Sequence, residues 1–191
     1  MKTVFVRNLI VLAGLHLALT TVAQVPAPAG DACHAVFHGS SALHDFEGAV
    51  NASAVQTTFS DKTWTLRIEV PVAAMNTKNA GRDKNMRKMF EVEKFPLIAV
   101  SGKDLAYPGG AEPVKLTGTI KIRDREQPGS ATLENFSLKD GVATFTLKGE
   151  VSLAAFQLKP PSAMLGMFRV GDKVKLEGSL TIRRWPRGAS Q

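Results

Sequence analysis

The chain has 191 residues, of which 44% are hydrophobic, and a formal net charge of +7. Its single cysteine excludes an intramolecular disulfide, so stability must come from a core and from backbone hydrogen bonding. The cations are spread along the chain without interleaved aromatic residues, which argues against nucleic acid as a partner. The mild positive charge leaves weak contact with an anionic membrane surface open.

Residues 1–23 have the three parts of a secretory signal peptide. Lys2 and Arg7 give a positive start, residues 9–19 form an apolar run, and the small residues before Ala23 suit cleavage. The run is shorter than the roughly 18 to 20 residues that a membrane span needs, so we favour cleavage near Ala23 over a retained anchor. The predicted destination is the periplasm, or secretion from the cell.

Most of the remaining chain alternates apolar and polar residues with a period of two, which predicts half-buried strands. The clearest strands are expected at residues 63–72, 114–122, 143–153 and 174–182, with shorter ones at 35–37, 46–51, 55–59, 97–105 and 131–138. Turn residues separate them at 60–62, 107–110, 127–130 and 139–141. This pattern predicts an antiparallel meander of about eight strands, folded as a sandwich or a barrel.

Three glycines favour a barrel over a flat sandwich. Gly118, Gly149 and Gly178 fall on the apolar side of their strands, where glycine often marks a sharp bend or the close approach of a ligand. The apolar residues that share these strands are expected to point into the barrel; they are Trp64, Leu66, Ile68, Leu116, Ile120, Phe145, Leu147, Leu176 and Leu180.

Residues 82–97 interrupt the β pattern with a short amphipathic helix. Met86, Met89 and Phe90 share one face of it, while cations such as Arg82 occupy the other sides. We expect Asp83 to cap the helix and Phe95 and Pro96 to end it. The helix is predicted to cover a cavity, with Arg82 or Arg87 facing the polar head of a ligand.

A second candidate for a movable cover is the loop at 160–168, which begins with two prolines and ends at Phe168. Five methionines (75, 86, 89, 164 and 167) fall in or near these two segments. Methionine side chains are flexible and suit irregular apolar cavities, although most methionines are ordinary core residues. The sequence therefore predicts one helix and one gating loop at the cavity.

No catalytic constellation is evident. His34, His38 and His44 lie close together in the sequence, and a pair of them with Asp45 or Cys33 is the one arrangement that could hold a metal. Their spacing matches no established ligand pattern, and no nucleophilic serine accompanies His44. We therefore assign no catalytic residue, no metal and no cofactor, and keep a redox or enzymatic use of His38 and His44 only as the weakest alternative.

Several motifs resemble the YceI-like domain family. The motifs are Arg82-Asp83, Met86-Arg87, Phe90-Glu91-Val92 and Lys94-Phe95-Pro96, together with residues 40–48, 116–122 and 170–176. The resemblance covers roughly residues 33 to 184. It implies a lipocalin-like antiparallel barrel, exported in bacteria, that holds a long isoprenoid or similar lipid tail.

These observations divide the chain into a signal peptide (1–23), a flexible leader (24–32), one barrel domain (33–185) and a C-terminal tail (186–191). The predicted function is non-enzymatic binding of an apolar, isoprenoid-type lipid inside the barrel. The ligand-binding residues would be Trp64, Leu66, Ile68, Arg82, Met86, Met89, Phe90, Leu116, Ile120, Phe145, Leu147, Phe168, Leu176 and Leu180. The alternative is a stress-related interaction or scaffold protein with a filled barrel. The oligomeric state stays open, with a homodimer as one option.

Overall fold

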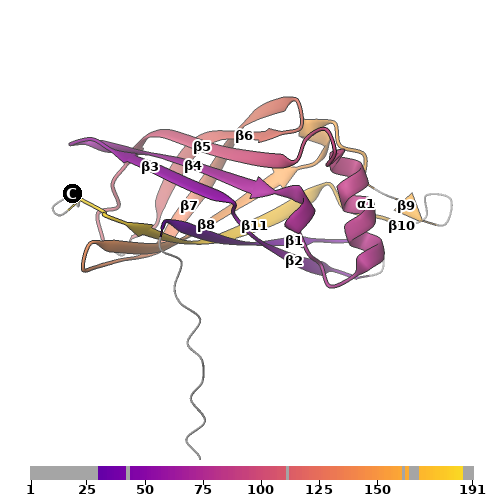
Figure 1. The fold of residues 1–191 in the computed structure, drawn as a ribbon, viewed down its shortest axis with the longest axis horizontal. Helices are drawn as coiled ribbons and strands as arrows, with labels where there is room; N and C mark the ends of the chain where they lie inside the picture. The colour runs from indigo at the N-terminus through magenta and orange to yellow at the C-terminus, as the bar shows by residue number, and fades with distance from the viewer. Residues whose placement is uncertain (1–29, 42–43, 111, 161, 164–167, 187–191) are drawn as a thin grey trace, which may run out of the picture.

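The computed structural model describes residues 30–41, 44–110, 112–160, 162–163 and 168–186 (Figure 1). The expected signal peptide lies outside the described residues, as do most of the leader, Met164 and Met167 of the expected gating loop, and nearly all of the C-terminal tail. Within the described part, no helix is both long enough and apolar enough to cross a bilayer.

The described residues form one large antiparallel sheet. Its nine strands are β1 (Ala32–Gly39), β2 (Phe46–Asn51), β3 (Ala54–Phe59), β4 (Thr63–Pro71), β5 (Leu97–Ala106), β6 (Val114–Ile122), β7 (Arg125–Lys139), β8 (Val142–Ser152) and β11 (Lys173–Arg183). They are ordered β2-β1-β11-β8-β7-β6-β5-β4-β3. The sheet curls around a common interior (Figure 1). The prediction of an all-β antiparallel barrel is confirmed, with nine strands in place of about eight.

The remaining elements are short. They are η1 (Val72–Ala74), α1 (Ala80–Phe90), η2 (Ala154–Phe156), and a small ribbon of β9 (Ser162–Ala163) and β10 (Phe168–Arg169). The α1 helix lies across one end of the barrel, and β11 ends near the other (Figure 1). We call these the helix end and the floor end.

The two edge strands of the sheet, β2 and β3, are consecutive in the chain and separated only by Ala52 and Ser53. The amide of Ala52 donates to the Cys33 carbonyl of β1 at 2.9 Å, and the amide of Ser53 donates to the Glu69 carbonyl of β4 at 2.8 Å. The β2–β3 segment is therefore one bent strand that pairs with β1 at one end and with β4 at the other. Counted in this way, the nine strands form a barrel of eight strands.

Toward the floor end, Asp31 connects the same two sides of the curled sheet. Its carboxylate accepts hydrogen bonds from Thr57 Oγ1 of β3 at 3.0 Å and from the Arg183 amide of β11 at 2.7 Å. These bonds connect two strands that are far apart in the sheet order. The carboxylate thus acts as a bridge where the backbone ladder does not continue.

The turn expected at residues 127–130 is wrong. Pro128 lies inside β7, opposite Thr119 of β6, and the turn is made instead by Arg123 and Asp124. Arg123 adopts a φ of 57°, the left-handed conformation that such a tight connection needs. The Pro-Gly pair suggested a turn by composition, but the alternating pattern of β7 begins before it, at Arg125.

The N-terminus of α1 differs from the prediction. Asn79, not Asp83, is the capping residue, and its side chain accepts the Arg82 amide at 2.9 Å. Asp83 is buried, and one oxygen of its carboxylate accepts both the amide and the hydroxyl of Thr77, at 3.0 and 2.6 Å. A buried carboxylate requires such partners. Asp83 therefore fastens α1 to the segment that precedes it.

The C-terminus of α1 also comes earlier than expected. The helix ends at Phe90 because Glu91 adopts a left-handed conformation with φ 51°. The amide of Val92 then donates to the Arg87 carbonyl at 3.1 Å, which satisfies a carbonyl that the helix leaves unpaired. Phe95 and Pro96 follow a further turn and lead into β5 rather than ending the helix.

The floor end of the barrel is filled by aromatic rings. Trp64, Phe145 and Trp185, which we call the aromatic floor, are 1, 3 and 2% exposed. Their ring centroids lie 5.1 Å apart for the two tryptophans, 5.8 Å for Trp64 and Phe145, and 6.1 Å for Phe145 and Trp185. Phe59, Tyr107 and Phe136 also contact the Trp185 ring.

The strand glycines mark the close approach of neighbouring strands. A Cβ atom on Gly118 would overlap the Ser101 carbonyl oxygen of β5, and one on Gly149 would lie 3.0 Å from the Ser130 carbonyl oxygen of β7. At Gly178 the nearest atom would be Cys33 Sγ at 3.4 Å, an ordinary contact. The close approach of the β5 backbone therefore explains why residue 118 is a glycine, and the approach of a ligand is not needed.

Gly118→Ala is accordingly expected to destabilise the fold. The added methyl group must displace β5 backbone, and overpacking of this kind costs about 1 to 3 kcal/mol. Gly81→Ala in α1 provides the opposite case, because its Cβ would be 3.4 Å from the nearest atom and alanine favours a helix by roughly 0.5 to 1 kcal/mol. Urea unfolding of both variants measures the difference, and equal stabilities would contradict it.

Candidate functional site: an apolar cavity under α1

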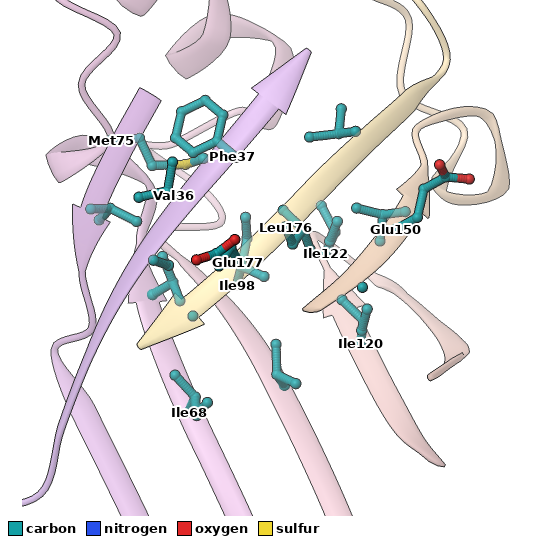
Figure 2. A pocket seen from close by; sticks show the side chains of 18 of the residues that line it. Val36, Phe37, Ile68, Met75, Ile98, Ile120, Ile122, Glu150, Leu176 and Glu177 are labelled. Atoms are coloured by element: carbon teal, nitrogen blue, oxygen red, sulfur yellow. The ribbon is translucent and has the colours of Figure 1, made fainter. Parts of the chain in front are cut away.

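The helix end of the barrel contains a cavity of about 230 Å³. Its walls are mostly aliphatic and come from strands on all sides of the barrel; they include Cys33, Ala35, Phe37, Val50, Ile68, Val70, Ile98, Val100, Ile120, Ile122, Leu147, Val151, Val174, Leu176 and Leu180. Figure 2 shows Phe37 and Met75 toward one end of this space and Ile68 and Ile120 toward the other. At roughly 30 Å³ each, about eight water-sized groups would fill this volume.

The α1 helix supplies part of the cavity wall. Met86, Met89 and Phe90 all line it; Met86 and Phe90 are buried and Met89 is partly buried. The segment before the helix is fixed to the barrel by two backbone hydrogen bonds between Asn76 and Ala49 of β2, at 2.9 and 3.0 Å. Together with the Asp83 anchor, these bonds fasten the N-terminal end of α1 to the barrel.

Arg82 is the one cation among the described residues that line the cavity. Its guanidinium lies 4.5 Å from the centre of the Phe46 ring, a cation–π contact that holds the side chain at the cavity wall. Arg87 points elsewhere: it is exposed and does not line the cavity. The structure therefore places Arg82, and not Arg87, at the cavity, a choice that the sequence left open.

Two acidic residues also border the cavity. The carboxylate of Glu150 points away from the apolar side chains and pairs with Lys173 at 3.0 Å (Figure 2). Glu177 is exposed on β11, where the strand alternation directs it opposite to Leu176. The charged groups other than Arg82 are thus directed toward solvent.

Cys33 is a free thiol in the cavity wall. Burial raises its pKa to about 11, so the thiol is neutral at physiological pH and behaves as a small apolar group. His34 and His38 are exposed; the Nδ1 atom of His34 is 2.8 Å from Asn51 Oδ1, and that of His38 is 3.7 Å from Glu47 Oε2. Within the described residues, no group of His, Cys, Asp and Glu could hold a metal.

A smaller cavity of about 70 Å³ lies deeper in the barrel. Leu66, Leu105 and Leu116 line it, and it shares Val100, Ile120 and Leu147, as well as residues 130 and 131, with the larger cavity. The two spaces are therefore neighbours separated by shared side chains. The aromatic floor lines neither of them.

The structure brings most of the predicted site residues together. Those that line the larger cavity are Ile68, Arg82, Met86, Met89, Phe90, Ile120, Leu147, Leu176 and Leu180. Leu66 and Leu116 line only the smaller cavity. Trp64 and Phe145 line neither, because their rings pack on each other and on Trp185. For Phe168 only the backbone pairing with Ala163 is described.

Other cavity residues were not assigned to the site from the sequence. Phe37 lies in β1, where Ala35, Val36 and Phe37 form an apolar run without alternation, and Phe46 is the first residue of the short strand β2. Met75 precedes α1 as an isolated methionine, and no periodic pattern places it at the cavity. Val70, Ile98 and Ile122 could have been found, since each continues the inward alternation of its strand.

Comparison with curated proteins gives no sequence match for this chain. Solved structures share its fold at low identity. BcnA of Burkholderia cenocepacia is 15% identical, with a TM-score of 0.65 over 78% of this chain and 95% of its own. A polyisoprenoid binding domain of Saccharophagus degradans, implicated in plant cell wall breakdown, is 12% identical, with a TM-score of 0.59 over 80% and 97%.

The YceI protein of Campylobacter jejuni is 21% identical, with a TM-score of 0.51 over 67% of this chain and 78% of its own. The family model of the YceI-like domain matches residues 28–182, which includes every strand of the barrel up to Ile182 of β11. The chain belongs to the YceI-like domain family.

Proposed function

We propose that this chain is an exported, non-enzymatic binding protein that holds an apolar lipid tail of isoprenoid type in the larger cavity. The single observation that carries the proposal is an aliphatic space under a helix whose inner face is Met86, Met89 and Phe90. Such a concave, mostly apolar site with few polar groups is the usual form of a small-molecule pocket. The family, and a fold neighbour described as a polyisoprenoid binding domain, support the same ligand class.

Burial of the tail supplies the affinity. Each buried methylene contributes about 0.8 kcal/mol, so a tail that fills the cavity gains several kcal/mol before any contact with its head group. Arg82 is proposed to meet that head group, because it is a cation held at the wall of an otherwise apolar space. A phosphate or another anionic head is the chemistry that a guanidinium recognises best.

Export and membrane contact are parts of the same proposal. The signal-like residues 1–23 would send the protein to the periplasm or outside the cell. Lys84, Arg87 and Lys88 are exposed on α1, opposite the face that lines the cavity. Weak attraction of these cations to anionic lipid would bring the helix end toward the membrane from which a lipid tail must come.

Native mass spectrometry of the protein purified from its host tests the function directly. We expect an added mass that organic extraction removes, and uptake of a polyprenyl or quinone compound by the extracted protein. Recovery of no lipid together with no uptake would overturn the proposal and favour the scaffold alternative.

Met89→Lys is expected to abolish retention of a bound polyprenol. The new ammonium would have to lie against an apolar tail, which is costly enough to keep the cavity from closing around it. Asn85→Lys is the matched control, because it adds the same charge to the same helix at an exposed position. Extraction and mass analysis of both variants measure the loss. Equal retention in the two variants would show that α1 does not cover the ligand.

Arg82→Gln is expected to weaken polyprenyl phosphate while leaving the corresponding alcohol almost unchanged. The lost charge-assisted contact is worth about 1.5 to 3 kcal/mol, or roughly tenfold to a hundredfold in Kd. Arg87→Gln makes the same change outside the cavity and should alter neither ligand. Calorimetric titration of the two ligands against both variants distinguishes the roles, and a parallel loss for phosphate and alcohol would exclude head-group recognition by Arg82.

A further inference from the structure

The barrel narrows and then closes from the helix end to the floor end. Along β4 the inward residues are Val70 and Ile68 in the larger cavity, Leu66 in the smaller one, and Trp64 in the aromatic floor. Strand β8 repeats the order, with Val151 and Gly149 in the larger cavity, Leu147 shared by both, and Phe145 in the floor. Two strands on different sides of the barrel therefore place the same sequence of layers along its axis.

The aromatic floor is a firm stop. Trp64 is 1% exposed, Trp185 2% and Phe145 3%, and the indole Nε1 of Trp64 donates to the Ala106 carbonyl at 3.1 Å. Large rings that contact one another on several sides leave no room for a chain to pass without unpacking them. The interior is thus a blind-ended space rather than a tunnel.

We propose that this chain limits the length of the apolar tail it accepts: the last carbons of the tail occupy the smaller cavity between Leu66 and Leu116, and the aromatic floor, one layer further along β4 and β8, leaves no room for a longer tail. The inference rests on the proposed function and adds the length of the ligand to it. The strand from Val70 to Leu66 spans about 13 Å. An extended isoprene unit takes roughly 5 Å at ordinary bond lengths. The preferred tail is therefore about three isoprene units long.

Val100, Ile120 and Leu147 form the boundary that a tail must pass to reach the smaller cavity. A Cβ atom built on Gly129 would lie 3.0 Å from Ile120 Cδ1, so the Ile120 side chain occupies the space that a side chain at residue 129 would need. Short tails end above this boundary and gain nothing from the smaller cavity. Tails that pass it gain from contacts with Leu66, Leu105 and Leu116.

A series of isoprenols tests the limit by calorimetric titration: geraniol, farnesol, geranylgeraniol and solanesol. Affinity should rise by roughly fourfold per additional buried carbon until the tail reaches the floor, and then stop rising or fall. A continued rise through solanesol, or no dependence on length, would overturn the length limit and leave the proposed function standing. Failure of every isoprenol to bind would overturn the proposed function, and the length limit with it.

The intrinsic tryptophan fluorescence of the chain can report the position of the tip of the tail. Its two tryptophans are Trp64 and Trp185, and both belong to the aromatic floor. Alkanols brominated at the terminal carbon quench tryptophan emission at short range, and Trp64 is the next inward residue of β4 after Leu66, which lines the smaller cavity. Quenching should begin only at the chain length that reaches the smaller cavity, and it should be absent for shorter alkanols that bind. Quenching that is independent of length would contradict a tip position at the floor.

Two substitutions should move the limit in opposite directions. Leu116→Phe fills the smaller cavity and should lower the affinity for farnesol at least tenfold without changing that for geraniol, while Leu66→Ala should extend the accepted length. Leu133→Ala is the control for lost core packing, because Leu133 is fully buried and lines neither cavity. If Leu66→Ala and Leu133→Ala give the same length profile as the unaltered protein, the smaller cavity is not the tip site.

Discussion

The site depends on the way one chain segment joins the two edges of the sheet. Strand β2 pairs with β1, its continuation β3 pairs with β4, and only Ala52 and Ser53 lie between. Both of these residues keep their amides bonded through the bend. Without this segment the sheet would present two unpaired edges and an open groove, and neither a cavity wall nor a dry interior would result. The closure of the sheet into a barrel is therefore fixed by the short covalent link between β2 and β3.

The interior is filled unevenly because the size of the inward side chains falls along the strands. Strand β4 runs from tryptophan and leucine at the floor end to isoleucine and valine at the helix end, and β8 runs from phenylalanine and leucine to glycine and valine. Gly149 and Gly178 border the larger cavity; a Cβ atom on Gly149 would lie only 3.0 Å from the Ser130 carbonyl oxygen, whereas one on Gly178 would make an ordinary contact with Cys33. The aromatic floor is a tightly packed core at one end of the barrel. The other end can therefore contain an apolar cavity while the barrel remains one packed unit.

Strand alternation predicted the barrel well because a period of two survives any tertiary arrangement in which one face is buried. The 3.6-residue period of Met86, Met89 and Phe90 likewise predicted the inner face of α1. Positions fixed by single contacts could not be predicted. The burial of Asp83 depends on Thr77, and the place of Trp185 depends on rings from four strands and on Tyr107 in the loop after β5. Composition also misled at Pro128, where tertiary pairing overrides a turn signal.

Sequence alone could not say whether the barrel is hollow or filled, because alternation gives the direction of a side chain and not the space left between opposite walls. Trp64 and Leu66 have the same inward pattern, yet one closes the floor and the other borders a cavity. The difference comes from residues across the barrel, such as Phe145 and Leu116, which are distant in the sequence. Only the assembled barrel distinguishes them.

The energetic cost of the larger cavity argues for an occupant. At about 24 cal/mol per Å³, an apolar space of about 230 Å³ would forgo about 5 to 6 kcal/mol if nothing filled it, as much as the whole stability of a marginal domain. Leucine in place of Val70 or Val174 would recover part of it by ordinary core packing. A tail bound only to the folded state would return this free energy by mass action.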